Sequence, residues 1–295
     1  MTERVPTMRF PQTGSAAAAA TRAFYRDPPF AGGHFGPRMG LEPLSLEHWL
    51  PYGISAAEQL RKQRLFRDHC SSVYLALSSA APVARAEALA CSAIRAAQPR
   101  APLLPVSTSV PLLVAAAERV PDDLLLLWQP VSGAPYQLLA ASLCSPSYWR
   151  LGDKLGGTLA AVHAPVRGFP PELKTRMERF FERLPAERCF LRRNWSVHPA
   201  AVRFEPDPAR EFLDVGPAAE WFVRSERQTV RRLADDLVLF TVRVDLHPLA
   251  AIHASRAAVL DLELALDQLA GDDLHEFGGS RKRRRVLAAL AAGQG

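Results

Sequence analysis

The segment WFVRSERQTV, residues 221–230, carries a cation, a carboxylate and an amide at alternate positions. Side chains of a β-strand alternate between its two faces, so Arg224, Glu226 and Gln228 are predicted to project from the same face. Such a row could donate hydrogen bonds to a bound ligand and pair with an ammonium group. The alternative is a solvated face whose charges form ion pairs across neighbouring strands.

A single histidine, His163 in the segment AVHAPV, is a second candidate for chemistry. It lies four residues after Leu159, in a stretch where apolar residues recur at helical spacing. Pro165 restricts the residue before it to extended geometry, so the helix is predicted to end near His163. A histidine at a helix C-terminus, beside small residues, could serve as an axial metal ligand. The alternative is a core histidine that hydrogen-bonds to the backbone.

The segment FLRRNWSVH, residues 190–198, carries further candidates. Arg192 and Asn194 are predicted to share one strand face, with Arg193 on the other. Arginine binds carboxylates through two parallel hydrogen bonds, so either arginine could hold an acidic group. Exposed ion pairs are the alternative for both arginines.

Two more segments could contribute polar groups. Asp122 and Asp123 follow Pro121 at the start of a predicted strand and could hold an amine, because carboxylates stabilise ammonium groups in a low dielectric. Alternatively, both aspartates are simply residues of a turn. Tyr148 and Lys154 lie between the predicted hairpin and His163, and Lys154 could reach an acidic group. A structural role at the helix start, with Asp153 as the cap, is the alternative.

Composition limits the possible functions. The chain has 295 residues, which allows a sizeable core, and a net charge of +6. The basic run RKRRR at 281–285 could contact nucleic acid, but no recognised nucleic-acid motif accompanies it, and a solvated helix start is favoured. No segment is apolar enough to predict a membrane span, and we expect a cytoplasmic protein.

Missing motifs narrow the chemistry further. Four cysteines without a C-x-x-C pair argue against a zinc site, an iron–sulfur cluster and covalently attached haem, and favour a reducing compartment. There is no G-x-S-x-G, H-E-x-x-H, P-loop or G-x-G-x-x-G motif. Without a dinucleotide fingerprint, an oxygenase of this sequence would have to receive electrons from another protein.

The periodicities predict an α+β fold. We expect a flexible arm over 1–27, a main domain over 28–253 and a helical extension over 254–295. Helices are predicted at about 55–68, 83–97, 148–163, 171–184 and 257–269, with one beginning near 109 and another at the end of the chain. Strands are predicted at about 123–128, 136–144, 188–197, 221–230 and 237–245.

The order of six segments, MGLEPLSLEHWL, DDLLLLW, YQLLAASLCSPSYW, DKLGGTLAAVHAPV, RRNWSV and RSERQTVRRL, resembles the alpha-subunit family of haem-dependent oxidative N-demethylases. The resemblance covers about residues 30–249. The sequence departs from the family pattern at Asp122, Arg167, Arg193 and Ala234. The resemblance implies a PAS-like haem-binding core, here about 122–246, and the predicted order of two strands, a helical crossover and three strands suits an antiparallel PAS-like sheet.

The resemblance implies an activity as well as a fold. The family activates oxygen at a secondary or N-methyl amine and releases the methyl group as formaldehyde, using haem b and electrons from separate flavin and iron–sulfur components. A membrane partner is not expected, and a nucleic-acid partner is disfavoured. Two alternatives stay open: a haem-binding sensor or scaffold without turnover, and a haem enzyme that acts on a nitrogen centre of a specialised metabolite.

The resemblance also implies roles for the candidate residues. His163 matches the family's I-H-x-P-V-P segment and would bind the iron, although His69, His198, His247 and His253 are other possible ligands. Arg224 and Gln228 would polarise bound oxygen, and Glu226 would position the amine. Further substrate contacts are assigned to Asp122, Asp123, Tyr148 and Asn194. Further cofactor contacts are assigned to Lys154, Arg192, Arg193 and Arg227.

Overall fold

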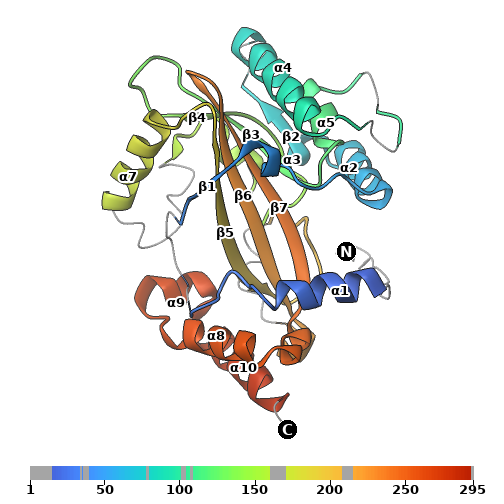
Figure 1. Cartoon of the computed structure of the whole chain (residues 1–295), viewed down its shortest axis with the longest axis vertical. Helices are drawn as coiled ribbons and strands as arrows, with labels where there is room; N and C mark the ends of the chain where they lie inside the picture. The colour runs from blue at the N-terminus through green and yellow to red at the C-terminus, as the bar shows by residue number, and fades with distance from the viewer. Residues whose placement is uncertain are drawn as a thin grey trace, which may run out of the picture.

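The computed structural model describes residues 15–33, 35, 40–77, 80–100, 104–106, 109–159, 171–207 and 215–293. Seven antiparallel strands form one sheet in the order β1-β5-β6-β7-β3-β4-β2 (Figure 1). They are β1 (Glu42–Leu44), β2 (Tyr74–Ala76), β3 (Asp123–Trp128), β4 (Gln137–Ser142), β5 (Cys189–His198), β6 (Phe222–Ala234) and β7 (Leu237–Pro248). The fold is therefore α+β, and the five strands predicted from the sequence are confirmed.

Helices surround the sheet. In Figure 1, α2, α4 and α5 gather at one end of the long strands, α8 and α10 at the other, and α7 lies beside the sheet. The helices are α1 (Ser15–Phe24), α2 (Ala56–Asp68), α3 (Cys70–Val73), α4 (Ala80–Ala97), α5 (Leu112–Ala117), α7 (Pro171–Glu182), α8 (Arg256–Asp267), α9 (Gly271–Phe277) and α10 (Gly279–Ala292). Within the described ranges, no helix is both long and apolar enough to cross a membrane.

Strand β3 is an uninterrupted apolar run because both of its faces are covered. Leu124 and Leu126 belong to one buried cluster, together with residues of α4 and α5. Leu125 and Leu127 belong to a second cluster that includes Phe181 of α7. The central hairpin thus separates two cores, one on each face of the sheet.

The predicted start of α2 is confirmed. Ser55 caps the helix, and its side chain accepts a hydrogen bond from the backbone N–H of Glu58 at 3.2 Å. This arrangement satisfies one of the amide groups that have no partner inside the first helical turn.

The prediction of a continuous helix from residue 148 was wrong for the residues up to 158. The chain forms only a 3₁₀ turn, Leu151–Asp153, and then a further turn in which Gly156 has φ +75°. That left-handed conformation suits glycine and interrupts a helix. Thr158 then forms an antiparallel bridge with Gln137. His163 and the rest of residues 160–170 lie outside the described residues.

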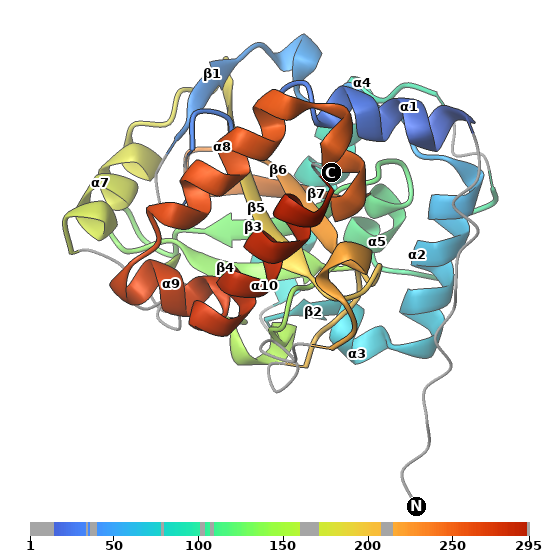
Figure 2. The ribbon, with the colours of Figure 1, turned by 90° about the horizontal axis from the view of Figure 1, so that it is seen from below.

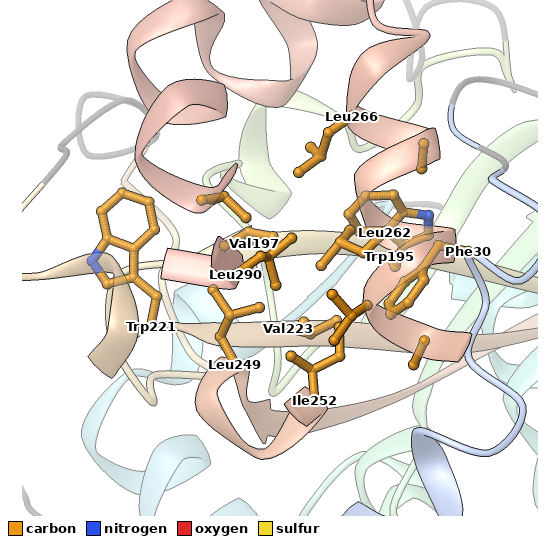
Figure 3. Packing of buried hydrophobic residues seen from close by; sticks show 14 of the residues in the cluster. Phe30, Trp195, Val197, Trp221, Val223, Leu249, Ile252, Leu262, Leu266 and Leu290 are labelled. Carbon is orange, nitrogen blue, oxygen red and sulfur yellow. The ribbon is translucent and has the colours of Figure 1, made fainter. Parts of the chain in front are cut away.

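The C-terminal helices close a third core against the far ends of β5 and β6. Figure 3 shows Trp195, Val197 and Val223 of the sheet in one cluster with Leu262 and Leu266 of α8 and Leu290 of α10. Seen from below, α8, α9 and α10 lie across this end of the sheet (Figure 2). Helices α8 and α10 of the predicted extension therefore pack on the sheet.

The segment predicted as a flexible arm also contributes to this region. Residues 15–24 form α1, and Phe24 stacks on His247 of β7 with ring centroids 3.7 Å apart. Tyr25 is buried and donates a hydrogen bond to the Pro248 carbonyl at 2.9 Å. At least the part from residue 15 onward is thus attached to the sheet.

The basic run 281–285 lies in α10, and two of its arginines contact neighbouring elements. Arg283 pairs with Asp267 at 2.9 Å. The Arg285 guanidinium lies 4.6 Å from the centroid of the Trp221 ring. These contacts fix α10 to its neighbours, which favours the structural interpretation of the run over a nucleic-acid site.

We expect Leu266→Ala to lower the free energy of unfolding by about 2–5 kcal/mol, because it removes a fully buried side chain and leaves a cavity. Leu260 on the same helix is 53% exposed, so Leu260→Ala is the matched control and should change stability little. Denaturant titration of both variants measures the difference. Equal effects of the two substitutions would contradict the packing of α8.

Candidate functional site

The predicted row on β6 exists, and Glu226 is its centre. The Glu226 Oε1 atom accepts a hydrogen bond from Arg224 Nε at 3.1 Å, and Oε2 accepts one from Gln228 Nε2 at 2.8 Å. Asn194, its cross-strand neighbour on β5, donates to Oε2 at 3.4 Å. Arg192 extends the group by donating to Gln228 Oε1 at 3.2 Å. We refer to these five residues as the polar row.

The polar row keeps its carboxylate charged. Burial by itself would raise the pKa of Glu226, but the charge of Arg224 and the hydrogen bonds from Gln228, Arg224 and Asn194 hold it below its usual value. Burial also lowers the pKa of Arg192, against the opposing effect of Glu226. With both arginines protonated, two guanidinium groups face one carboxylate, so the row carries one excess positive charge.

Arg224 is fixed by the backbone as well as by Glu226. Its side chain is among the most deeply buried in the described chain, at 1% exposure. Nη2 donates to the Ser145 carbonyl at 2.6 Å and Nη1 to the Arg203 carbonyl at 3.4 Å. Because those carbonyls belong to two different loops, Arg224 ties both loops to the polar row.

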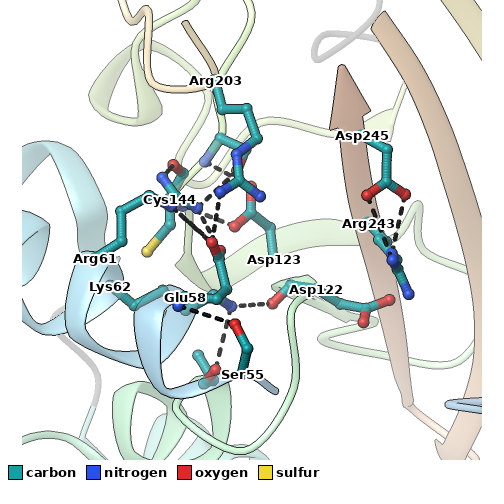
Figure 4. A network of polar contacts seen from close by, with 12 residues as sticks. Ser55, Glu58, Arg61, Lys62, Asp122, Asp123, Cys144, Arg203, Arg243 and Asp245 are labelled. Carbon is teal, nitrogen blue, oxygen red and sulfur yellow. Dashed lines mark hydrogen bonds and ion pairs between the residues drawn. The ribbon is translucent and has the colours of Figure 1, made fainter. Parts of the chain in front are cut away.

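A second charged group, missed by the sequence analysis, lies beside these loops (Figure 4). Glu58 of α2 pairs with Arg61 at 2.7 Å and with Arg203 at 2.5 Å. Arg61 also donates to the Cys144 carbonyl at 2.8 Å. The only signal in the sequence was the S-x-x-E pattern, which marks Glu58 as a helix-start residue and does not identify its arginine partners.

The structure does not bring Asp122 and Asp123 together. The Asp123 carboxylate accepts hydrogen bonds from the backbone N–H groups of Cys144 and Ser145, both at 2.8 Å, and so braces the end of the hairpin. Asp122 instead accepts a hydrogen bond from Thr241 at 3.4 Å. Consecutive strand residues face opposite sides of the sheet, which explains why they diverge.

Tyr148 and His198 form a stacked pair near the Arg224 end of the polar row. Their ring centroids are 5.1 Å apart with planes 8° from parallel, and the Tyr148 hydroxyl lies 3.2 Å from His198 Nδ1. Ser196 Oγ lies 2.8 Å from His198 Nε2. Ser196 is the cross-strand partner of Arg224. Strand alternation places Ser196 and His198 on the face predicted for Arg192 and Asn194, in agreement with these contacts.

The remaining cofactor candidates are dispersed. Arg193 pairs with Asp27 at 2.6 Å, and Arg227 donates to the carbonyls of His48 and Trp49, both at 2.9 Å. Both arginines alternate with the polar row along their strands and therefore lie on the opposite face. Lys154 is half-buried, and burial lowers its pKa.

The polar row adjoins an apolar surface on the same face of the sheet. Half-buried side chains packed against the α7 core form this surface: Trp149, Met177, Phe190, Phe240 and Val242. In register, Val242 lies opposite Gln228 and Phe190 opposite Val230. A flat apolar group with acidic substituents would find both apolar contacts and guanidinium partners here.

The comparisons now identify the family. Residues 85–287 match the family described as haem-dependent oxidative N-demethylase, alpha subunit-like. The match spans more than half of the 295 residues, and the chain belongs to this family. This confirms the resemblance found in the sequence. A comparison with curated proteins found no match.

The residues of the site can be examined for groups that would hold the family's haem. No group of three or more His, Cys, Asp or Glu in the described part of the chain could hold a bare metal ion. A haem iron is already bound by its porphyrin and can be held by one proximal histidine. The apolar surface and Arg192 suit a flat ring that carries carboxylates.

We expect Asp122 to destabilise the folded protein as it ionises. Burial raises its pKa to about 6, despite the nearby charges of Lys62, Arg227 and Arg243. The folded state thus binds more protons than the unfolded state between about pH 4 and 6, so stability falls as pH rises through this window. The loss should reach about 2–3 kcal/mol, because each pKa unit is worth about 1.4 kcal/mol.

The Asp122→Asn variant should not show this fall in stability with rising pH, because its amide is neutral at every pH used. Urea titrations between pH 4 and 7 measure it, with Asp68→Asn as control, since Asp68 is exposed on α2. Parallel profiles for wild type and Asp122→Asn would show that Asp122 ionises as in an unfolded chain.

Proposed function

We propose that this protein is a haem-dependent oxidoreductase that removes a methyl group from a secondary or N-methyl amine. The observation that carries the proposal is the buried polar row beside an apolar surface, in a chain that belongs to the N-demethylase alpha-subunit-like family. The family relationship supports the reaction class, and the polar row supplies a charged carboxylate for an ammonium substrate.

The sheet supports a PAS-like core in this proposal. The hairpin β3–β4 is followed by a crossover segment and then by β5, β6 and β7. Strand β7 returns to pair with β3, so the hairpin and the three later strands form one continuous antiparallel surface. We place the functional unit from about residue 85 to α10, because the family match reaches residue 287 and α10 packs on the sheet.

Haem b, when bound, would supply the oxygen-activating redox chemistry. We assign the iron ligand to His163 by its match to the family segment, and the propionate partners to Arg192 and Lys154 by their charge. Arg193 and Arg227 are left out of this assignment, because their side chains lie on the other face and bind Asp27 and backbone carbonyls.

The polar row would bind and orient the substrate. Glu226 pairs with the ammonium form of the amine, and its charge persists because three donors stabilise it. Arg224 and Gln228 hold this carboxylate in place and present the hydrogen-bond donors closest to it. Asn194 completes the row, whereas Asp122 and Asp123 act in the fold.

Electrons would come from a separate protein in this proposal. The sequence has no dinucleotide-binding fingerprint, and the family is defined as an alpha subunit. A flavin and iron–sulfur reductase component is the partner we propose, because it can deliver the two electrons that each demethylation consumes.

The haem assignment predicts a visible absorption spectrum. Wild-type protein expressed with a haem supply should show a Soret band, and His163→Ala should lose or strongly shift it, because the axial ligand is removed. His69→Ala is the control, since His69 is exposed at the end of α2. A wild-type protein that stays colourless after reconstitution would overturn the proposed function.

The role of Glu226 predicts a kinetic effect. Glu226→Gln keeps the shape of the side chain but removes the charge, so kcat/KM for the amine should fall at least about tenfold, or about 1.4 kcal/mol. The Soret spectrum should be unchanged. Asp68→Asn, which alters an exposed carboxylate of α2, is the control. Turnover of Glu226→Gln at the wild-type rate would remove Glu226 from the mechanism.

A further inference from the structure

We propose that Tyr148, His198 and Ser196 form a proton-transfer path from the edge of the molecule to the face that carries the polar row. Tyr148 and Ser196 are half-buried and His198 between them is 4% exposed, so the path runs through a buried ring. The inference rests on the proposed function, because it assigns a route to the protons that oxidative demethylation consumes.

The three polar side chains form a continuous series of hydrogen-bonding contacts. The Tyr148 hydroxyl lies 3.2 Å from His198 Nδ1, and Ser196 Oγ lies 2.8 Å from His198 Nε2. Both distances are suitable for proton transfer along a hydrogen bond. The imidazole therefore bridges two hydroxyl groups on opposite sides of its ring.

The Ser196 end of this series lies next to the polar row. Ser196 pairs in register with Arg224, and Asn194, the next residue on the same face of β5, contacts Glu226. Strand alternation places Ser196, Asn194 and Arg224 on one face of the sheet. A proton that reaches the Ser196 hydroxyl thus arrives at the face where we place the amine.

The charge state of His198 suits a relay. Burial, together with the positive charges of Arg224 and Lys282, holds the pKa of His198 well below its usual value, so the ring is neutral near pH 7. A neutral imidazole carries one donor nitrogen and one acceptor nitrogen. It can accept a proton from Tyr148 at Nδ1 while it gives one to Ser196 from Nε2, and Tyr148 then regains a proton from solvent. The ring now carries its proton on Nδ1, so it must return to its starting tautomer before the next transfer.

The backbone holds Tyr148 in an unfavourable conformation to make this contact. Its φ is +61°, and it is the only non-glycine residue with positive φ in the described ranges. Such a conformation costs of the order of 1–3 kcal/mol and persists only where the surroundings impose it. The Tyr148 N–H donates to the Glu205 carbonyl at 2.6 Å, which fixes the position of the ring.

The same loop supports Tyr148 and the polar row. Residues 201–207 supply the Glu205 carbonyl to Tyr148 and the Arg203 carbonyl to Arg224. Arg203 is itself held by Glu58 of α2. Relief of the strain at Tyr148 would therefore require a change in the loop that also fixes the polar row.

The proposed reaction needs such a path because it consumes protons. For a secondary amine, R–NH–CH₃, oxygen, two electrons and two protons give R–NH₂, formaldehyde and water. The methyl carbon gains one oxygen atom and loses its bond to nitrogen, and the second oxygen atom leaves as water. The electrons come from the reductase component, and the two protons must enter from solvent.

Tyr148→Phe tests the path, because it removes only the hydroxyl and keeps the stacked ring. With haem uptake unchanged, we expect kcat to fall about tenfold or more and KM for the amine to stay constant. The solvent deuterium effect on kcat should increase, because proton delivery becomes limiting. Tyr52→Phe is the matched control, since Tyr52 is 54% exposed. Equal kcat and an equal deuterium effect in Tyr148→Phe and wild type would overturn the path.

A second readout does not depend on turnover. ¹⁵N NMR of the histidine rings should show His198 neutral near pH 7, with both nitrogens shifted by hydrogen bonding, and Tyr148→Phe should change the Nδ1 signal. A His198 ring that titrates near pH 6.5, or that is unaffected by Tyr148→Phe, would also overturn the path. Absence of haem from wild type would instead overturn the proposed function.

Discussion

The burial of the Arg224 guanidinium is the constraint on which the rest of the site depends. A charge removed from water is costly unless it is paired and every donor finds an acceptor. Arg224 meets this requirement with Glu226 from its own strand and with carbonyls of Ser145 and Arg203 from two loops. Strand register, loop position and charge balance are therefore fixed together, and a change in any one of them leaves a buried charge unpaired.

This constraint extends beyond the sheet through Arg203. Its carbonyl supports Arg224, while its side chain binds Glu58 of α2. Burial opposes ionisation of Glu58, but Arg61 and Arg203 hold its pKa below the usual value, so it remains charged. Helix α2 is thus connected electrostatically to a site that it does not line. In this way an element outside the matched residues 85–287 supports the site.

Local patterns in the sequence were sufficient for the strands and for the polar row. Alternation along β6 placed Arg224, Glu226 and Gln228 together, because a strand has a fixed two-residue period. The apolar run of β3 was read correctly as a buried strand because it is too short for an independent helix. The pairing of β7 with β3 joins residues more than a hundred positions apart, and only the family resemblance pointed to it.

Predictions that depended on tertiary partners were less successful. The two aspartates 122 and 123 seemed equivalent in sequence, yet one binds backbone amides and the other faces Thr241. The spacing of Leu155 and Leu159 predicted a helix, but Gly156 adopts positive φ and Thr158 pairs with β4. The role of Glu58 depended on Arg203, which is 145 residues away, so no local pattern could show it.

The excess charge of the polar row constrains how an amine can bind there. Two guanidinium groups and one carboxylate leave a net positive charge, which repels an ammonium ion in a low dielectric. In the proposed function, an acidic group of the cofactor must first neutralise Arg192, and only then does Glu226 present an effective negative charge to the substrate. Amine affinity should therefore depend on cofactor occupancy. Arg192 is connected to Glu226 through Gln228, which accepts a hydrogen bond from Arg192 and donates one to Glu226.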